Sequence, residues 1–116
     1  MKIGLVDDSV ILRSAIRNVL ESSGYEVVLE AGSSVELFDQ LTKTAPELIL
    51  LDVFFPTENG LDMLARLCKQ YPQIKVLLVT GLKQETIAQE AKRLGACGIL
   101  YKPFDTDDLL NAVKQA

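Results

Sequence analysis

The sequence predicts an α/β fold in which a parallel sheet of five strands is covered by helices on both faces. Short apolar runs alternate five times with longer segments whose apolar residues recur at helical spacing. The short runs are apolar throughout, which is typical of parallel strands buried on both sides. The chain has 116 residues, of which 48% are hydrophobic, and this is enough to bury one core without metals or disulfides. We therefore expect residues 1–116 to form a single domain.

Five apolar runs are the expected strands. Each is short and lies beside a glycine, a proline or an acidic residue that can end it. They are residues 2–7 (KIGLVD), 26–31 (EVVLEA), 48–52 (LILLD), 75–80 (KVLLVT) and 98–101 (GILY).

The first two helices are expected on either side of the second strand. Residues 9–23 have apolar side chains at helical spacing, and Gly24 follows as a C-terminal cap. Ser33 and Glu36 have the spacing of a capping box at the start of the second helix. We expect Pro46 to end that helix.

Three further helices follow the third, fourth and fifth strands. Pro72 is expected to stop the third and Gly95 to close the fourth, while Thr106 can cap the last. Their apolar faces are formed by Leu64, Leu67, Cys68 and Tyr71, by Ile87, Ala91 and Leu94, and by Leu109, Ala112, Val113 and Ala116.

The alternation of strands and helices indicates a doubly wound sheet. Crossovers between parallel strands are right-handed, so successive helices pack onto the two faces of the sheet. The five-stranded version with strand order 2-1-3-4-5 is the flavodoxin-like arrangement, and its switch point lies between the first and third strands.

Polar side chains stand where four of the five expected strands end. Asp7 and Asp8 lie at the end of the first strand, Asp52 at the end of the third, Thr80 at the end of the fourth and Lys102 just after the fifth. Ligands of such sheets bind beyond the carboxyl ends of the strands, at the switch point. Each residue alone could be part of a turn, a helix cap or a solvated surface. Their shared placement indicates a functional site.

The residue types at this edge favour phosphoryl transfer with a metal ion. Two like charges about 4 Å apart repel by roughly 4 kcal/mol at an effective dielectric constant of about 20, so three clustered carboxylates require a cation. Oxygen ligands without histidine or cysteine favour Mg²⁺. Asp52 can then stay ionised and act as a nucleophile. Lys102, the Thr80 hydroxyl and a backbone N–H would hold the phosphoryl oxygens, and Gly81 leaves room for the phosphate.

Composition excludes several other functions. The chain contains no histidine, which excludes Ser-His-Asp and Cys-His nucleophiles. The net charge is −4 and no basic stripe is present, so we expect no direct nucleic-acid binding by this domain. No apolar run approaches the roughly 20 residues that span a bilayer, so no membrane partner is expected. We expect Cys68 and Cys97 to be buried thiols in a reducing cytoplasm.

The sequence resembles the receiver domains of response regulators in two-component signalling, and the resemblance covers the whole chain. The matching elements are V-D-D at 6–8, L-L-D at 50–52, P-x-x-N-G at 56–60, T-G at 80–81, G-A at 95–96 and K-P-F at 102–104.

This resemblance implies that Asp52 accepts a phosphoryl group. It implies that Asp8 and Asp52 bind Mg²⁺ directly, that Asp7 acts through water, and that the main-chain carbonyl of Phe54 is a further ligand. The chain would be a signalling phosphoacceptor that assists its own phosphorylation and dephosphorylation, not an enzyme.

The resemblance also implies a switch and partners. Thr80 would move to hydrogen-bond the phosphoryl group, Lys102 would pair with it, and the Lys102–Pro103 bond is expected to be cis. The donor would be a phosphohistidine of a sensor histidine kinase or a phosphotransfer protein, and the change of shape would regulate an output domain or a downstream effector. The sequence does not decide whether the receiver stands alone or is the N-terminal part of a larger regulator such as a transcription factor. It also does not decide whether the chain forms a homodimer.

The sequence departs from the receiver pattern at two important places. Phe54 stands where many members have a polar side chain, and Ile99 stands where many have an aromatic ring that turns inward on activation. Tyr101 lies on the same strand face as Ile99.

These departures keep one alternative open, a pseudo-receiver that acts only as a protein-interaction module. A Mg²⁺-dependent phosphatase is disfavoured because Phe54 replaces the general acid that such enzymes need. A flavodoxin is disfavoured because the first loop lacks a phosphate cradle.

Overall fold

The computed structural model describes residues 1–116 and contains five strands and five helices in alternation. The strands form one parallel sheet in the order β2-β1-β3-β4-β5, which confirms the predicted topology. The strands are β1 (Lys2–Val6), β2 (Glu26–Ala31), β3 (Leu48–Asp52), β4 (Lys75–Thr80) and β5 (Gly98–Tyr101).

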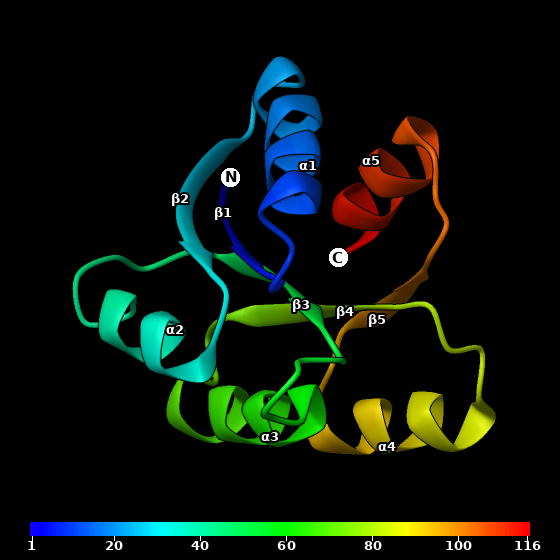
Figure 1. The fold of residues 1–116 in the computed structure, drawn as a ribbon. Coiled ribbons are helices and arrows are strands. Elements are labelled where there is room, and N and C mark those ends of the chain that lie inside the picture. The colour runs from blue at the N-terminus through cyan, green and yellow to red at the C-terminus, as the bar shows by residue number, and fades with distance from the viewer.

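Helices cover both faces of this sheet (Figure 1). On one face lie α1 (Val10–Ser22) and α5 (Thr106–Gln115), and on the other lie α2 (Ser34–Gln40), α3 (Gly60–Gln70) and α4 (Glu85–Leu94). Each face therefore has its own hydrophobic core, with 12 buried residues on the α1 and α5 side and 17 on the other. No helix combines the length and the apolar character that crossing a membrane would require.

The central strand β3 shows how the two cores are filled. Leu48 and Leu50 point into the core under α1 and α5, while Ile49 and Leu51 point into the opposite core. Complete burial of such a side chain stabilises the fold by about 2 kcal/mol. Asp52 is the exception in this strand, because it is a buried acid at the strand's last position.

The second helix ends earlier than the sequence suggested. The prediction that Pro46 ends it is wrong, because α2 already stops at Gln40. The Thr42 hydroxyl donates a hydrogen bond to the Asp39 carbonyl at 2.6 Å. This local bond competes with continuation of the helix, and the segment before Pro46 forms turns instead.

Two predicted helix caps are also corrected. The cap of α5 is Asp105, not Thr106, because the Asp105 carboxylate accepts the Asp108 N–H at 2.8 Å and forms a full capping box. The capping box predicted for α2 is only half present. Ser33 accepts the Glu36 N–H at 3.3 Å, but the Glu36 carboxylate accepts from the residue before Ser33.

The cysteines are less buried than expected. Both are free thiols, with Cys68 partly buried and Cys97 exposed. Cys97 immediately precedes β5, which is an edge strand of the sheet, so no further strand covers it. The prediction of two buried thiols is therefore wrong for Cys97.

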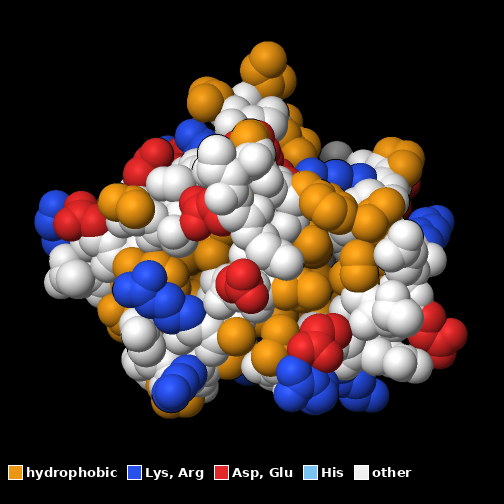
Figure 2. Space-filling model, turned by 60° about the horizontal axis from the view of Figure 1, so that its bottom comes forward, with side chains coloured by type: hydrophobic (Ala, Val, Ile, Leu, Met, Phe, Trp, Pro, Cys, Tyr) orange, Lys and Arg blue, Asp and Glu red, His pale blue; other side chains and the backbone are white.

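The face that bears α2, α3 and α4 has mixed charge. Figure 2 shows basic and acidic side chains interspersed with apolar ones over this face, without a continuous basic stripe. One of the basic groups, the Arg66 guanidinium, lies 3.7 Å from the centre of the Phe38 ring and covers the edge of the core. This face therefore lacks the basic stripe that is typical of nucleic-acid binding.

Candidate functional site

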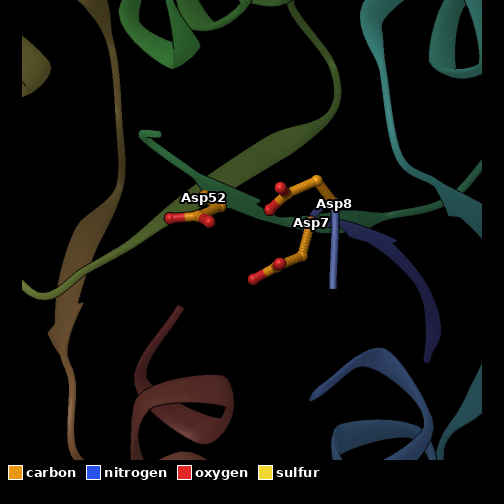
Figure 3. Close-up of side chains that lie close together, drawn as sticks. All are labelled: Asp7, Asp8 and Asp52. Carbon is orange, nitrogen blue, oxygen red and sulfur yellow. The ribbon is translucent and has the colours of Figure 1, made fainter. Parts of the chain in front are cut away.

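Three carboxylates meet at the carboxyl edge of the sheet, where the switch point was expected. Asp7 and Asp8 follow β1, and Asp52 ends the neighbouring strand β3. One oxygen of each lies within 4.8 Å of the others. Figure 3 shows Asp7 and Asp8 extending from the end of β1 toward the side chain of Asp52.

Asp52 is the most enclosed acid of this cluster, with 6% of its surface exposed. Its Oδ1 accepts the N–H of Val53 at 2.8 Å and the N–H of Phe54 at 3.5 Å. Its Oδ2 lies 3.5 Å from the Lys102 ammonium. Burial, followed by the charge of Asp7, raises the pKa of Asp52 above its usual range, although Lys102 and the two amides oppose this effect.

Asp7 and Asp8 differ in how the protein holds them. Asp7 is buried, and its Oδ1 accepts the N–H of Ser9 at 2.8 Å while its Oδ2 lies 3.3 Å from the Lys102 ammonium. Asp8 is exposed, and its carboxylate accepts no hydrogen bond from the protein. Asp8 is therefore the acid best able to bind an external cation.

Lys102 bridges the two buried acids. Its ammonium pairs with both Asp7 and Asp52, and its main-chain N–H donates to the Thr80 carbonyl at 2.8 Å. The Lys102–Pro103 bond is cis, as predicted. One lysine against three carboxylates leaves a local charge of about −2, which a divalent cation would neutralise.

The donor set fits Mg²⁺. All three side chains supply carboxylate oxygens, which are hard ligands, and neither histidine nor cysteine lies among them. Mg²⁺ prefers such oxygens and keeps several waters of its own, so a site open on the Asp8 side suits it.

Thr80 stands near this cluster but is not bonded to it. It ends β4 and is completely buried, and its hydroxyl accepts the N–H of Leu82 at 3.1 Å. It makes no hydrogen bond to Asp52 or to the Lys102 ammonium. At Gly81, an added Cβ would meet no atom within 4 Å, so the protein's own packing does not require glycine there.

The two departures from the receiver pattern have distinct surroundings. Phe54 is 52% exposed, while its backbone is fixed by an isolated bridge to Asn59. Ile99 is partly buried against the core under α2, α3 and α4. Tyr101 pairs with Thr80 in the strand register, and its ring centre lies 5.8 Å from the Lys83 ammonium.

Gly60 supports the site in a way that sequence reasoning missed. Its N–H donates to the Val53 carbonyl at 2.7 Å, and a Cβ there would lie 2.6 Å from the Val53 Cα and would also strike the Asp52 carbonyl. Only glycine lets α3 begin so close to the backbone that follows the acid. The glycine of the P-x-x-N-G element was the feature of the sequence that could have indicated this close approach.

Arg13 was also missed. Its guanidinium donates to the main-chain carbonyl of Asp7 and pairs with Glu30 at 3.4 Å. In the sequence it has the appearance of an ordinary charged residue on a helix, and no local pattern distinguishes it.

Comparison with known proteins identifies the family of this chain. Residues 3–114 match the family model described as the response regulator receiver domain, and the chain therefore belongs to this family. Members of the family are signalling phosphoacceptors of two-component and phosphorelay systems.

Individual relatives agree. The chain is 31% identical to the chemotaxis protein CheY of Listeria monocytogenes over 100% of this chain and 98% of that protein. It is 34% identical to the sporulation initiation phosphotransferase F of Bacillus subtilis over 98% of this chain and 91% of that protein. The structure matches a CheY-like receiver domain protein from Methanospirillum hungatei with a TM-score of 0.90 and 28% identity, over 98% and 90% of the two chains.

Proposed function

We propose that residues 1–116 form one receiver unit that takes a phosphoryl group onto Asp52 from a phosphohistidine of a sensor histidine kinase or a phosphotransfer protein. The main observation is the enclosed Asp52 carboxylate, within 4.8 Å of Asp7 and Asp8 and in contact with the Lys102 ammonium. Two acids and one lysine around a third acid suit a nucleophile that needs a cation to work.

The transfer exchanges one bond to phosphorus for another. A carboxylate oxygen of Asp52 forms the new O–P bond while the N–P bond of the phosphohistidine breaks. The bonding electron pair stays on the imidazole nitrogen, which takes a proton from water. Because this chain has no histidine, the donor is a separate protein or domain.

Four groups would hold Mg²⁺. Asp8 and Asp52 would bind it directly, Asp7 through water, and the main-chain carbonyl of Phe54 would add a fourth oxygen. When bound, the ion neutralises charge on the phosphoryl oxygens.

Lys102 and Thr80 would respond to the new charge. Lys102 exchanges its present carboxylate partners for a phosphoryl oxygen. The Thr80 hydroxyl turns from the Leu82 N–H toward the phosphoryl group, and Gly81 leaves the adjacent backbone accessible to it. Release of the Leu82 N–H frees the loop between β4 and α4 and shifts the population of its conformations.

The surface of α4 and β5 would report this change to an output domain or a downstream effector. Tyr101 is the aromatic residue suited to take part, since it pairs with Thr80 in register and approaches Lys83 of the β4–α4 loop. Ile99 stays packed against the core.

The donor protein would dock on α1. Val10 and Ile11 begin this helix and are 63% and 85% exposed, directly beside the acids. A largely apolar groove of about 570 Å³ lies between α1, which lines it from Leu12 to Val19, and the segment that follows Lys102. The free thiols are in keeping with a reducing cytoplasm as the place of this encounter.

Labelling by acetyl phosphate and Mg²⁺ tests the proposal. Intact-mass spectrometry should show one added phosphoryl group on the wild type and on a control variant, Asp39→Asn, but none on Asp52→Asn. A second measurement is Mg²⁺ titration, in which Asp8→Ala should weaken binding by at least tenfold.

The results distinguish the alternatives. Equal labelling of Asp52→Asn and the wild type would place the acceptor elsewhere. No labelling of the wild type would favour a pseudo-receiver that acts as an interaction module.

A further inference from the structure

Arg13 lies in α1 but directs its side chain toward the end of β1. Its side chain is only 13% exposed. One guanidinium nitrogen, Nη1, donates to the main-chain carbonyl of Asp7, and Nε pairs with Glu30 at 3.4 Å. The guanidinium therefore joins the start of α1, the end of β1 and the strand β2.

The Asp7 carbonyl has no partner in the sheet. The Asp7 N–H donates to the Ala31 carbonyl at 3.0 Å, and β2 ends at that residue. If β2 were longer, the N–H of a later residue could bond the Asp7 carbonyl, and Arg13 donates this hydrogen bond instead. Gly32 leaves space for this, since a Cβ there would lie 3.1 Å from the Arg13 Nη1.

The orientation of Asp8 depends on this contact. The carbonyl of Asp7 belongs to the peptide plane that links Asp7 to Asp8, so fixing the carbonyl fixes the direction in which Asp8 leaves the backbone. No hydrogen bond of its own holds the Asp8 carboxylate. A rotation of this plane would carry Asp8 away from the cluster in which the three acids lie within 4.8 Å.

We infer that Arg13 is a positioning residue for the cation site, which it prepares by locking the Asp7–Asp8 peptide. This inference rests on the proposed function, because it concerns the same Mg²⁺ site. Preorganised ligands bind a metal more tightly because less freedom is lost on binding, and loss of an outer partner typically weakens binding about 10- to 100-fold.

The positive charge of Arg13 has the opposite effect on Mg²⁺ affinity. A cation beside a Mg²⁺ site repels the ion, so removing the guanidinium would strengthen Mg²⁺ binding if charge alone mattered. Arg17 provides the matched control. It pairs with the same Glu30, at 2.6 Å, but does not touch the Asp7 backbone.

The test compares Arg13→Met with Arg17→Met by calorimetric titration of Mg²⁺. We expect Arg13→Met to weaken binding about tenfold and Arg17→Met to leave it within twofold of the wild type. Equal or tighter binding by Arg13→Met, or equal weakening in both variants, would overturn the inference. Failure of the wild type to bind Mg²⁺ would instead contradict the proposed function.

Two further readouts separate positioning from general destabilisation. At saturating Mg²⁺, acetyl-phosphate labelling of Arg13→Met should return to within about twofold of the wild type, because Arg13 touches no reacting atom. In Mg²⁺-free protein, the Ser9 amide, which donates to Asp7, should exchange its hydrogen faster in this variant than in Arg17→Met.

Should Arg13→Met not fold, Arg13→Lys replaces it, since lysine keeps the charge but lacks the fork that reaches both partners. About threefold weaker Mg²⁺ binding is then expected, and unchanged binding would overturn the inference.

Discussion

The two halves of the carboxyl edge are held very differently. At the ends of β1 and β3, backbone amides and Lys102 hold the carboxylates of Asp7 and Asp52, and Arg13 holds the main-chain carbonyl of Asp7. At the end of β4, the single hydroxyl of Thr80 bonds the loop that leads to α4. The helix α4 buries one residue, Ala91, whereas α3 buries four. The side chain of Gln84, the N-cap of α4, makes no capping hydrogen bond.

This difference suits the proposed function, in which phosphoryl transfer takes place at one end of this edge and is reported at the other. Moving a conformational equilibrium from 1:99 to 99:1 requires about 5.5 kcal/mol. Hydrogen bonds to a charged group contribute roughly 1.5–3 kcal/mol each, so two bonds to a phosphoryl group supply at most about 3–6 kcal/mol. Because Lys102 and Thr80 would give up existing partners for them, the net gain is smaller. The proposed switch would therefore require a surface that resists weakly, as α4 does.

The largest expected effect on stability is in the half of the edge formed by the ends of β1 and β3. Gly60→Ala should lower the free energy of unfolding by about 3 kcal/mol, because the new Cβ would collide with backbone atoms of Asp52 and Val53. Gly81→Ala is the matched control, since open space surrounds that position, and it should change stability by less than about 0.5 kcal/mol. Urea unfolding measures both. Equal losses would show that the two halves are equally constrained.

Replacement of Asp52 should have a smaller effect on stability, and of the opposite sign. Because its pKa is raised in the folded protein, the folded state binds this proton more tightly than the unfolded chain does. That contribution to stability is complete below the ordinary pKa of an aspartate and is lost as the pH rises through the raised value. At neutral pH the charged acid is thus destabilising, and Asp52→Asn should stabilise the protein by about 1 kcal/mol in the absence of Mg²⁺.

The pH and the metal serve as controls for this effect. The difference between Asp52→Asn and the wild type should shrink as the pH falls through the window between the two pKa values. At 100 times its dissociation constant, Mg²⁺ should stabilise the wild type by about 2.7 kcal/mol but the variant much less. A wild type more stable than the variant at neutral pH without metal would contradict the raised pKa.

The smallest expected effect on stability is in the other half, formed by the end of β4 and by α4. Gln84→Ser would provide the missing cap and should stabilise α4 by about 0.5–1 kcal/mol. Amide hydrogen exchange should slow within α4, and the change caused by phosphorylation should become smaller there. Unchanged exchange in α4 would show that its cap does not limit its motion.

Asp105→Ala, which removes the existing cap of α5, should destabilise that helix by about 1 kcal/mol.

The sheet and the placement of the acids were predictable because both follow from local sequence. Fully apolar runs identify buried parallel strands, and strand order places Asp7 beside Asp52. The position of Lys102 followed from the same logic. The roles of these residues in phosphoryl transfer stay predictions.

Features that depend on side-chain reach were not predictable. Arg13 meets Glu30 across 17 residues, and no periodicity encodes that contact. The choice of Asp105 over Thr106 as a cap depends on backbone angles that a sequence does not display. Cys97 is apolar in type but exposed, because an edge strand is covered less than a central one.

The salt bridge between Lys102 and Asp7 joins residues that are 95 positions apart. A polypeptide emerging from the ribosome makes Asp7 and Asp52 long before it makes this lysine. Until β5 has been synthesised and has paired with β4, the acids lack their charged partner. Under the proposed function, the capacity for phosphoryl transfer would thus arise only after residue 102 has been made and β5 has paired with β4, and a chain cut before Lys102 would lack the charged partner of both buried acids.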